Sequence, residues 1–236
     1  MVSARPSPCV LFVALGEEPV LCSCWAAKGG VGTTVVSVSL AVLWAAQSPE
    51  GALLIDLAGD APAALGVPEP DGPGVADWLK AGDDVLPEAV GRLEVEVAPG
   101  LGLIPRGSGS LEFGERAEVL AGWLAEDGRP VVADCGVLPG PAAATVLAGS
   151  ANHSLLVTRA CYLALRRVVA IPTQPSGVVL VSEPGRALGR AEVEQVVGAP
   201  VRAQISVEPA VARAVDAGVL ASRLPRALAR ALRGAA

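Results

Sequence analysis

Short apolar runs alternate with helical stretches along this chain, and that alternation predicts an α/β fold with a doubly wound, mostly parallel sheet and helices on both faces. The composition agrees, because the chain is 52% hydrophobic but only 3% aromatic, so small aliphatic side chains must fill the core, as in strands covered on both faces. Its 236 residues suffice for one large domain. We therefore expect a single domain over 1–236, with its core over about 19–236 and a short N-terminal extension over 1–18.

The expected strands are brief apolar runs bounded by turn residues. They span 10–15, 20–25, 52–55, 101–104, 131–133, 154–157, 178–181 and 201–205. The stretches between and after them have the length and composition of helices. These expected helices span 33–47, 74–81, 111–126, 141–147, 163–171, 191–197, 210–217 and 225–232.

Residues 28–34 read K-G-G-V-G-T-T and join the first long strand to a helix. Glycines let backbone N–H groups close around phosphate oxygens, and the helix N-terminus adds its dipole. The ordinary phosphate loop has a lysine just before its final Ser or Thr, and here Thr33 takes that place. The main-chain donors survive this change, so the expected nucleotide-binding residues are Lys28, Gly29, Gly30, Val31, Gly32, Thr33 and Thr34.

Acidic residues directly follow two of the expected strands, Asp56 after 52–55 and Asp134 after 131–133. In a parallel sheet these positions share the carboxyl edge, where ligands bind. A carboxylate there can hold Mg²⁺ beside the Thr34 hydroxyl. We therefore predict a metal site of Thr34, Asp56 and Asp134, with helix capping or loop solvation as the alternative role for each acid.

Composition excludes several classes of function. The formal net charge of −6 argues against a broad nucleic-acid surface. With His153 as its one histidine, the chain has no Ser-His-Asp, Cys-His or zinc-hydrolase set. The cysteines are scattered, and Cys22 and Cys24 lie on one face of a strand as small core residues.

No apolar stretch has the length of a membrane span, so we expect a cytoplasmic protein, at most peripheral to the inner face of the membrane. The C-terminal stretch 223–233 is basic and amphipathic, a pattern that suits either packing or an anionic membrane surface. Its apolar face is mostly Ala and Leu. We favour packing against the sheet over membrane association.

Taken in this order, the motifs resemble the MinD/ParA group of deviant P-loop ATPases. The loop at 28–32 is similar to the group's signature, 53–56 resembles its switch I strand, and 131–134 resembles its Walker B strand. The resemblance implies ATP and Mg²⁺ as ligands. It also implies a homodimer in which Lys28 reaches the partner's nucleotide.

The departures from that pattern concern catalysis. Thr33 replaces the loop lysine, and Ala58 stands where the group's second switch I aspartate positions water, with Asp60 two residues further on. At the positions that contact the base, Glu183 and Ser206 replace Asn and Pro. Because cation placement and water positioning supply most of the catalysis in phosphoryl transfer, we expect slow or absent hydrolysis. The remaining catalytic candidates are Lys28, Asp56 and Asp60.

Within the group, the loop and the segments 74–79 and 101–107 resemble CpaE/TadZ-like localisation factors. The resemblance implies a scaffold or positioning factor, with a protein partner in a larger machine such as secretion or pilus assembly, septum placement or partitioning. One alternative is an active ATPase that cycles between monomer and nucleotide-sandwich dimer. Another is a small-molecule enzyme on a Rossmann-like frame, which the loop disfavours because Gly30-x-Gly32 lacks the rest of a dinucleotide fingerprint.

Overall fold

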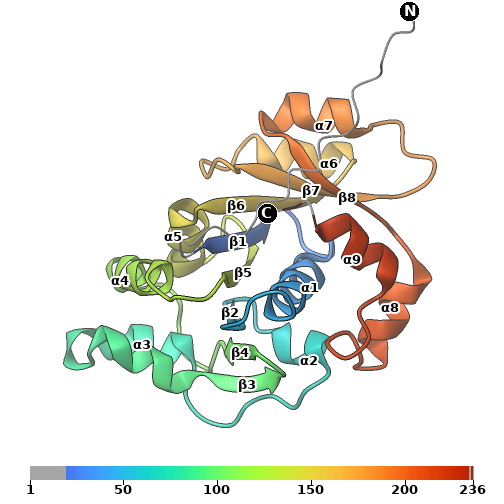
Figure 1. Cartoon of the computed structure of the whole chain (residues 1–236). Coiled ribbons are helices and arrows are strands. Elements are labelled where there is room, and N and C mark those ends of the chain that lie inside the picture. The colour runs from blue at the N-terminus through green and yellow to red at the C-terminus, as the bar shows by residue number, and fades with distance from the viewer. Residues whose placement is uncertain (1–19, 234, 236) are drawn as a thin grey trace, which may run out of the picture.

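A computed structural model describes residues 20–233 and 235, and the strands in this part of the chain form one sheet (Figure 1). The strand order is β3-β4-β2-β5-β1-β6-β7-β8. Every neighbouring pair is parallel except β3 with β4, which confirms the predicted doubly wound fold. The bounds are β1 Leu21–Ala26, β2 Ala52–Asp56, β3 Val95–Ala98, β4 Leu101–Ile104, β5 Val131–Val137, β6 His153–Arg159, β7 Gly177–Ser182 and β8 Val201–Ser206.

The helices follow the predicted alternation closely. They are α1 Thr33–Ala45, α2 Ala61–Leu65, α3 Val75–Ala81, α4 Gly114–Ala125, α5 Ala142–Ser150, α6 Tyr162–Val168, α7 Arg190–Val197, α8 Pro209–Asp216 and α9 Arg226–Leu232. Two 3₁₀ helices, Gly82–Asp84 and Pro87–Leu93, lie between α3 and β3. The strand expected at 10–15 and the extension over 1–18 lie outside the described residues.

Three kinds of element were missing from the prediction: α2, the 3₁₀ helices and β3. All are short, and β3 is only partly buried, so none has a strong apolar period. β3 is the edge strand of a hairpin with β4. Its pairing depends on the tight return at Pro99 and Gly100, where Gly100 has φ 70°. A left-handed residue of this kind lets the chain reverse at little steric cost.

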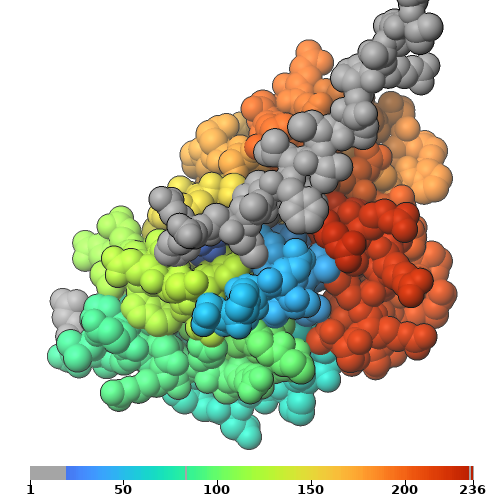
Figure 2. All heavy atoms as spheres, in the orientation of Figure 1, coloured from blue at the N-terminus to red at the C-terminus, as the bar shows by residue number. Residues whose placement is uncertain are grey.

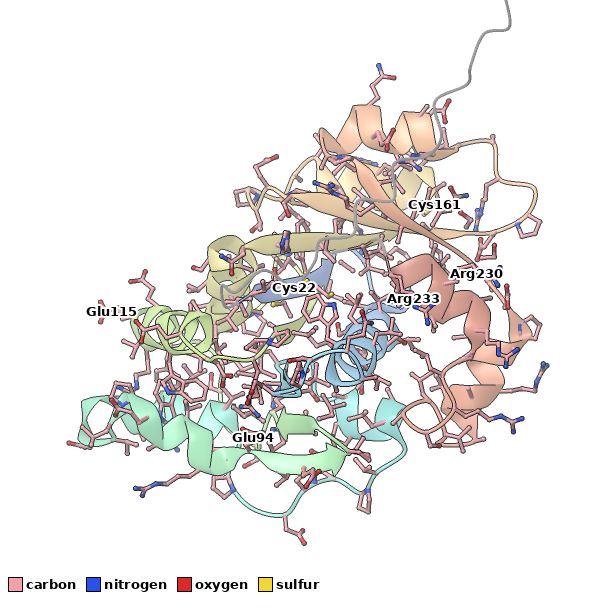
Figure 3. All side chains as sticks on the ribbon, in the orientation of Figure 1. Cys22, Glu94, Glu115, Cys161, Arg230 and Arg233 are labelled. Carbon is pink, nitrogen blue, oxygen red and sulfur yellow. The ribbon has the colours of Figure 1, made fainter. Side chains whose placement is uncertain are left out.

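Alternating residues of the central strand β1 feed two apolar layers. Leu21 and Trp25 belong to the layer that includes buried residues of α3–α7, while Cys22 and Cys24 belong to the layer of α1, α2, α8 and α9. Cys22, labelled in Figure 3, is fully buried, as expected for a small core residue. The Trp25 indole N–H donates to Ser154 Oγ at 2.9 Å, so this large core residue leaves no buried donor unpaired.

The C-terminal helix α9 packs on the domain. It lies against β8 and α1, and Leu228 and Leu232 are 2% and 1% exposed. Figure 2 shows this red segment as one flank of the molecule beside the blue segment that contains α1. Arg230 and Arg233, labelled in Figure 3, are exposed. The apolar side of α9 is therefore occupied by its own domain. No helix in the described part of the chain has both the length and the apolarity to cross a bilayer.

Candidate functional site

The loop between β1 and α1 has the backbone shape of an anion-binding turn. Gly30 and Gly32 adopt φ values of 75° and 93°, in the left-handed region that favours glycine. Gly32 is the N-cap of α1, and its carbonyl accepts the Val36 N–H at 3.0 Å. A Cβ on either glycine would meet no atom within 4 Å, so the space over the loop is open. The loop thus presents main-chain donors and a helix N-terminus to an open volume.

A cavity of about 730 Å³ lies against this loop. Its walls come from the loop itself, the segments that follow β2 and β4, the carboxyl end of β5 and the end of α8. Thr33, Thr34, Ala58, Asp60, Arg106 and Gly136 are among the lining residues. The volume is in the range of small-molecule and cofactor sites.

Asp134, in β5 two residues before Gly136 of the cavity wall, is a buried carboxylate with an unused oxygen. It has no exposed surface, and its Oδ1 accepts the Gly136 N–H at 3.2 Å, whereas Oδ2 has no hydrogen-bond partner. Burial raises its pKa to about 7, the nearby hydroxyls of Thr34 and Ser37 lower it, and the charge of Asp56 raises it. A buried acceptor that is left unpaired costs free energy, and a bound cation would offset that cost.

The unpaired oxygen of Asp134 indicates that this site can accept a cation, and the neighbouring residues suit Mg²⁺. Mg²⁺ is commonly held by one or two protein groups together with water and substrate phosphates, rather than by a cage of side chains. Thr34 and Asp134 supply such a partial set. Among residues 20–233 and 235 there is no group of three or more His, Cys, Asp or Glu side chains that could hold a metal ion.

Asp56 faces a different environment although it pairs in register with Asp134 across β2 and β5. Its Oδ1 accepts N–H bonds from Ala58 at 2.9 Å and Gly59 at 2.7 Å, and its Oδ2 accepts from Ala61 at 2.9 Å. Burial raises its pKa, and the three amide bonds lower it. The carboxylate shapes the β2–α2 turn, so loop formation is the role that its geometry supports, and its metal role stays a prediction.

The remaining predicted residues divide between the cavity and its surroundings. Thr33 is 8% exposed and lines the cavity, and its carbonyl accepts the Ser37 hydroxyl at 3.0 Å. Asp60 lines the cavity at its exposed rim. Lys28 is half-buried beside the cavity rather than in its wall, and no carboxylate of the described residues forms an ion pair with it.

Two arginines at this edge were not among the predicted site residues. Arg159, at the end of β6, donates to the Gly30 carbonyl at 3.1 Å and pairs with Glu183 at 2.6 Å, so it ties the loop to the end of β7. Arg106, two residues after β4, lines the cavity. The signal that could have found both is position, because each lies at or just beyond the carboxyl end of a parallel strand. Glu183 is held by Arg159 and Arg186 and does not line the cavity.

Comparison with known proteins places the fold. No family model matches the sequence, and no curated protein matches it either. Among solved structures, a ParA family ATPase from Chlorobium tepidum TLS aligns with a TM-score of 0.74 and 18% identity, over 92% of this chain and 97% of that chain. MinD from Pyrococcus horikoshii OT3, complexed with Mg-ADP, aligns at 0.71 and 20% identity, over 92% and 93%. 

MinD in the MinC:MinD cell division complex of Aquifex aeolicus aligns with a TM-score of 0.71 and 16% identity, over 91% of this chain and 93% of that chain. At such identities the likeness shows the fold. The part of the chain that the structure describes has the eight-stranded, mostly parallel α/β fold of the MinD/ParA-type P-loop ATPases.

Proposed function

We propose that this protein binds a nucleotide together with Mg²⁺ and hydrolyses it slowly or not at all, serving as a positioning factor for a larger cellular machine. The observation that carries the proposal is the unpaired, buried Oδ2 of Asp134, near the hydroxyl of Thr34 in a glycine-rich loop that lines a cavity of about 730 Å³. A loop of main-chain donors beside an unpaired carboxylate is suited to a phosphate with its cation.

Nucleotide binding in this proposal relies on backbone amides of the loop, the N-terminus of α1 and the side chains of Thr34 and Asp134. The main-chain amides of the loop and the N-terminus of α1 face the phosphates, and an anion at such a terminus gains up to about 2 kcal/mol. The Thr34 hydroxyl and Asp134 would hold Mg²⁺, which would neutralise phosphate charge. That arrangement compensates in part for the missing lysine at Thr33. The relative from P. horikoshii was solved with Mg-ADP.

The hydrolysis step lacks two groups. Thr33 cannot supply the positive charge of a lysine, and Ala58 cannot position a water molecule. Asp60 is the observation that favours the alternative, an active ATPase that cycles between monomer and dimer, because its carboxylate lines the cavity close to Ala58. The two functions differ in turnover, since a working ATPase would reach the usual range of about 1 s⁻¹ or more.

The positioning role also requires partners. Lys28 lies outside the cavity wall, so a contact with the nucleotide of a second copy is the role we propose for it, in a homodimer that brings the two loops together. A partner protein of the larger machine completes the proposal, with the CpaE/TadZ-like localisation factors as the model. The MinC:MinD complex of A. aeolicus is an example of such an assembly in a protein of this fold.

Calorimetric titration with Mg-ATP and Mg-ADP tests the proposal directly. We expect weak binding that requires Mg²⁺, and turnover well below about 1 s⁻¹. Gly32→Arg should abolish binding because it fills the open space over the loop. Gly198→Arg is the matched control, since Gly198 is also left-handed with no atom within 4 Å of its Cβ position but ends α7. Equal binding by the Gly32 variant would place the site elsewhere. Sedimentation with and without nucleotide tests the dimer.

A further inference from the structure

Arg106 is presented to the cavity by a tightly fixed segment of backbone. The carbonyls of Pro105 and Arg106 accept the N–H groups of Val75 and Ala76, at the start of α3, at 2.9 Å and 3.0 Å. A Cβ on Gly74 would lie 2.2 Å from the Gly107 nitrogen, so the two segments are in direct contact through their backbones. Such a contact leaves the segment little freedom, and the direction in which Arg106 leaves the backbone is set by the fold.

Arg106 lines the cavity with a positive charge that no carboxylate among the described side chains pairs with. Its stem lies over the β2–α2 turn, where a Cβ on Gly59 would be 3.1 Å from Arg106 Cδ. The guanidinium donates to the Gly107 carbonyl at 3.1 Å, and it forms no ion pair within the described residues. Asp60 and Asp216, the acidic residues of the cavity wall, are exposed at the rim. Arg106 is the cation of that wall in the described part of the chain.

The sheet order defines where this charge lies relative to the loop. β2 and β5 separate β1 from β4 in the sheet. The loop after β1 and the segment after β4 are therefore three strand spacings apart, about 14 Å. If the loop holds the inner end of a phosphate chain, the chain would extend over β5 and β2 toward Arg106. Its terminal phosphate would then be the one nearest the guanidinium.

We propose that Arg106 supplies the cation that the loop lost at position 33, and that it makes the site selective for a nucleoside triphosphate over a diphosphate. This inference rests on the proposed nucleotide binding. Thr33 has a short, uncharged side chain, whereas an arginine has a long stem and a planar fork that can bond two phosphate oxygens at once. The charge then comes from the far rim of the cavity rather than from the loop.

The test is calorimetric titration of Arg106→Gln and the parent with Mg-ATP and Mg-ADP. Losing a charge-assisted bond should weaken Mg-ATP binding about 10- to 100-fold and leave Mg-ADP binding nearly unchanged. Arg92→Gln is the matched control, because Arg92 is exposed and lies in the 3₁₀ helix Pro87–Leu93, outside the cavity wall. Arg106→Lys, which keeps the charge but loses the fork, should give an intermediate loss. Adding Thr33→Lys to Arg106→Gln should restore part of the Mg-ATP affinity.

Each outcome decides between the two proposals. If the parent binds neither nucleotide, the proposed function and this inference both fail. If the parent binds Mg-ATP and Arg106→Gln binds it equally well, the inference alone fails. An equal loss for Mg-ATP and Mg-ADP would also overturn it, because the terminal phosphate would not be the one contacted. Melting curves of the Lys and Gln variants close to that of the parent would show that affinity, rather than folding, has changed.

Discussion

Asp56 and Asp134 are the same residue type and pair in register on neighbouring strands, Asp56 as the last residue of β2 and Asp134 within β5, yet their surroundings differ in one decisive way. Both are fully buried. The oxygens of Asp56 accept three backbone N–H groups of the following turn, whereas Asp134 accepts one and keeps Oδ2 unpaired. Burial raises the pKa of each, and that of Asp134 reaches about 7.

The difference teaches that the role of such a carboxylate depends on the path of the backbone that follows it. After β2 the chain turns back toward Asp56, and backbone N–H groups of the turn donate to both of its oxygens. β5 instead continues past Asp134 to Val137, and the Thr34 and Ser37 hydroxyls lie near its carboxylate. One acid therefore stabilises the fold, while the other is held at a cost in stability that suits a ligand-binding role.

Removing the Asp56 carboxylate should give the largest effect on stability. Asp56→Ala leaves three amides of the β2–α2 turn without their acceptor, a loss on the order of 4–5 kcal/mol in the free energy of unfolding at about 1.5 kcal/mol for each bond. Asp56→Asn keeps part of the acceptor set and should lose less. Urea unfolding measures both, with exposed Asp71→Ala as the control. A loss below about 1 kcal/mol for Asp56→Ala would contradict the structural role.

Neutralising Asp134 should raise the free energy of unfolding rather than lower it. Its folded pKa of about 7 lies above the reference value of 3.8, so the free energy of unfolding falls as pH rises between those values and stays low above them. Asp134→Asn should therefore stabilise the protein by about 4 kcal/mol at pH 8 and leave it nearly unchanged near pH 4. Thermal unfolding at the two pH values, with Asp71→Asn as control, checks this. A destabilised variant at pH 8 would show that the carboxylate is well satisfied in the folded protein.

Restoring a lysine at position 33 of the loop should strengthen nucleotide binding without restoring hydrolysis. Thr33→Lys adds a charge-assisted bond to phosphate, so Mg-ATP affinity should rise about tenfold in calorimetry. Hydrolysis should stay slow, because Ala58 still cannot position a water molecule. Thr33→Val, of similar size and without charge, serves as the control. Turnover of about 1 s⁻¹ or faster in the lysine variant would show that Asp60 or another group performs that step.

The smallest expected effect comes from Ser37, whose hydroxyl is near Asp134. Its hydroxyl donates to the Thr33 carbonyl at 3.0 Å and helps to lower the Asp134 pKa. Ser37→Ala should lower the free energy of unfolding by about 0.5–1 kcal/mol and raise that pKa further. Carboxyl NMR titration measures the shift. Ser39→Ala is the control, since Ser39 donates to the Val35 carbonyl from the same helix and should leave the Asp134 titration unchanged.

Much of the fold was predictable because its signals are local. The apolar runs at 52–55 and 131–133 are β2 and the start of β5, and the glycines at 30 and 32 take the left-handed conformations that a phosphate loop needs. These features depend on residue type and chain order alone. The edge strand β3 was missed because four half-buried residues form a strand only through their hairpin with β4.

The sequence by itself determined the doubly wound sheet, the loop at 28–34 and the placement of Asp56 at the end of β2, because periodicity and backbone conformational preferences act over a few residues. Asp134 was expected just after its strand, but β5 continues to Val137 through its pairing with β1. Only the tertiary structure decided what those acids do. In the folded protein, Asp56 accepts hydrogen bonds from the loop that follows it, whereas Oδ2 of Asp134 stays unpaired. Arg106 lines a cavity formed with a loop that lies more than 70 residues away in the chain. The physical reason is that side-chain direction at a strand end depends on the loop that follows and on long-range contacts, such as that of Gly74 with Gly107.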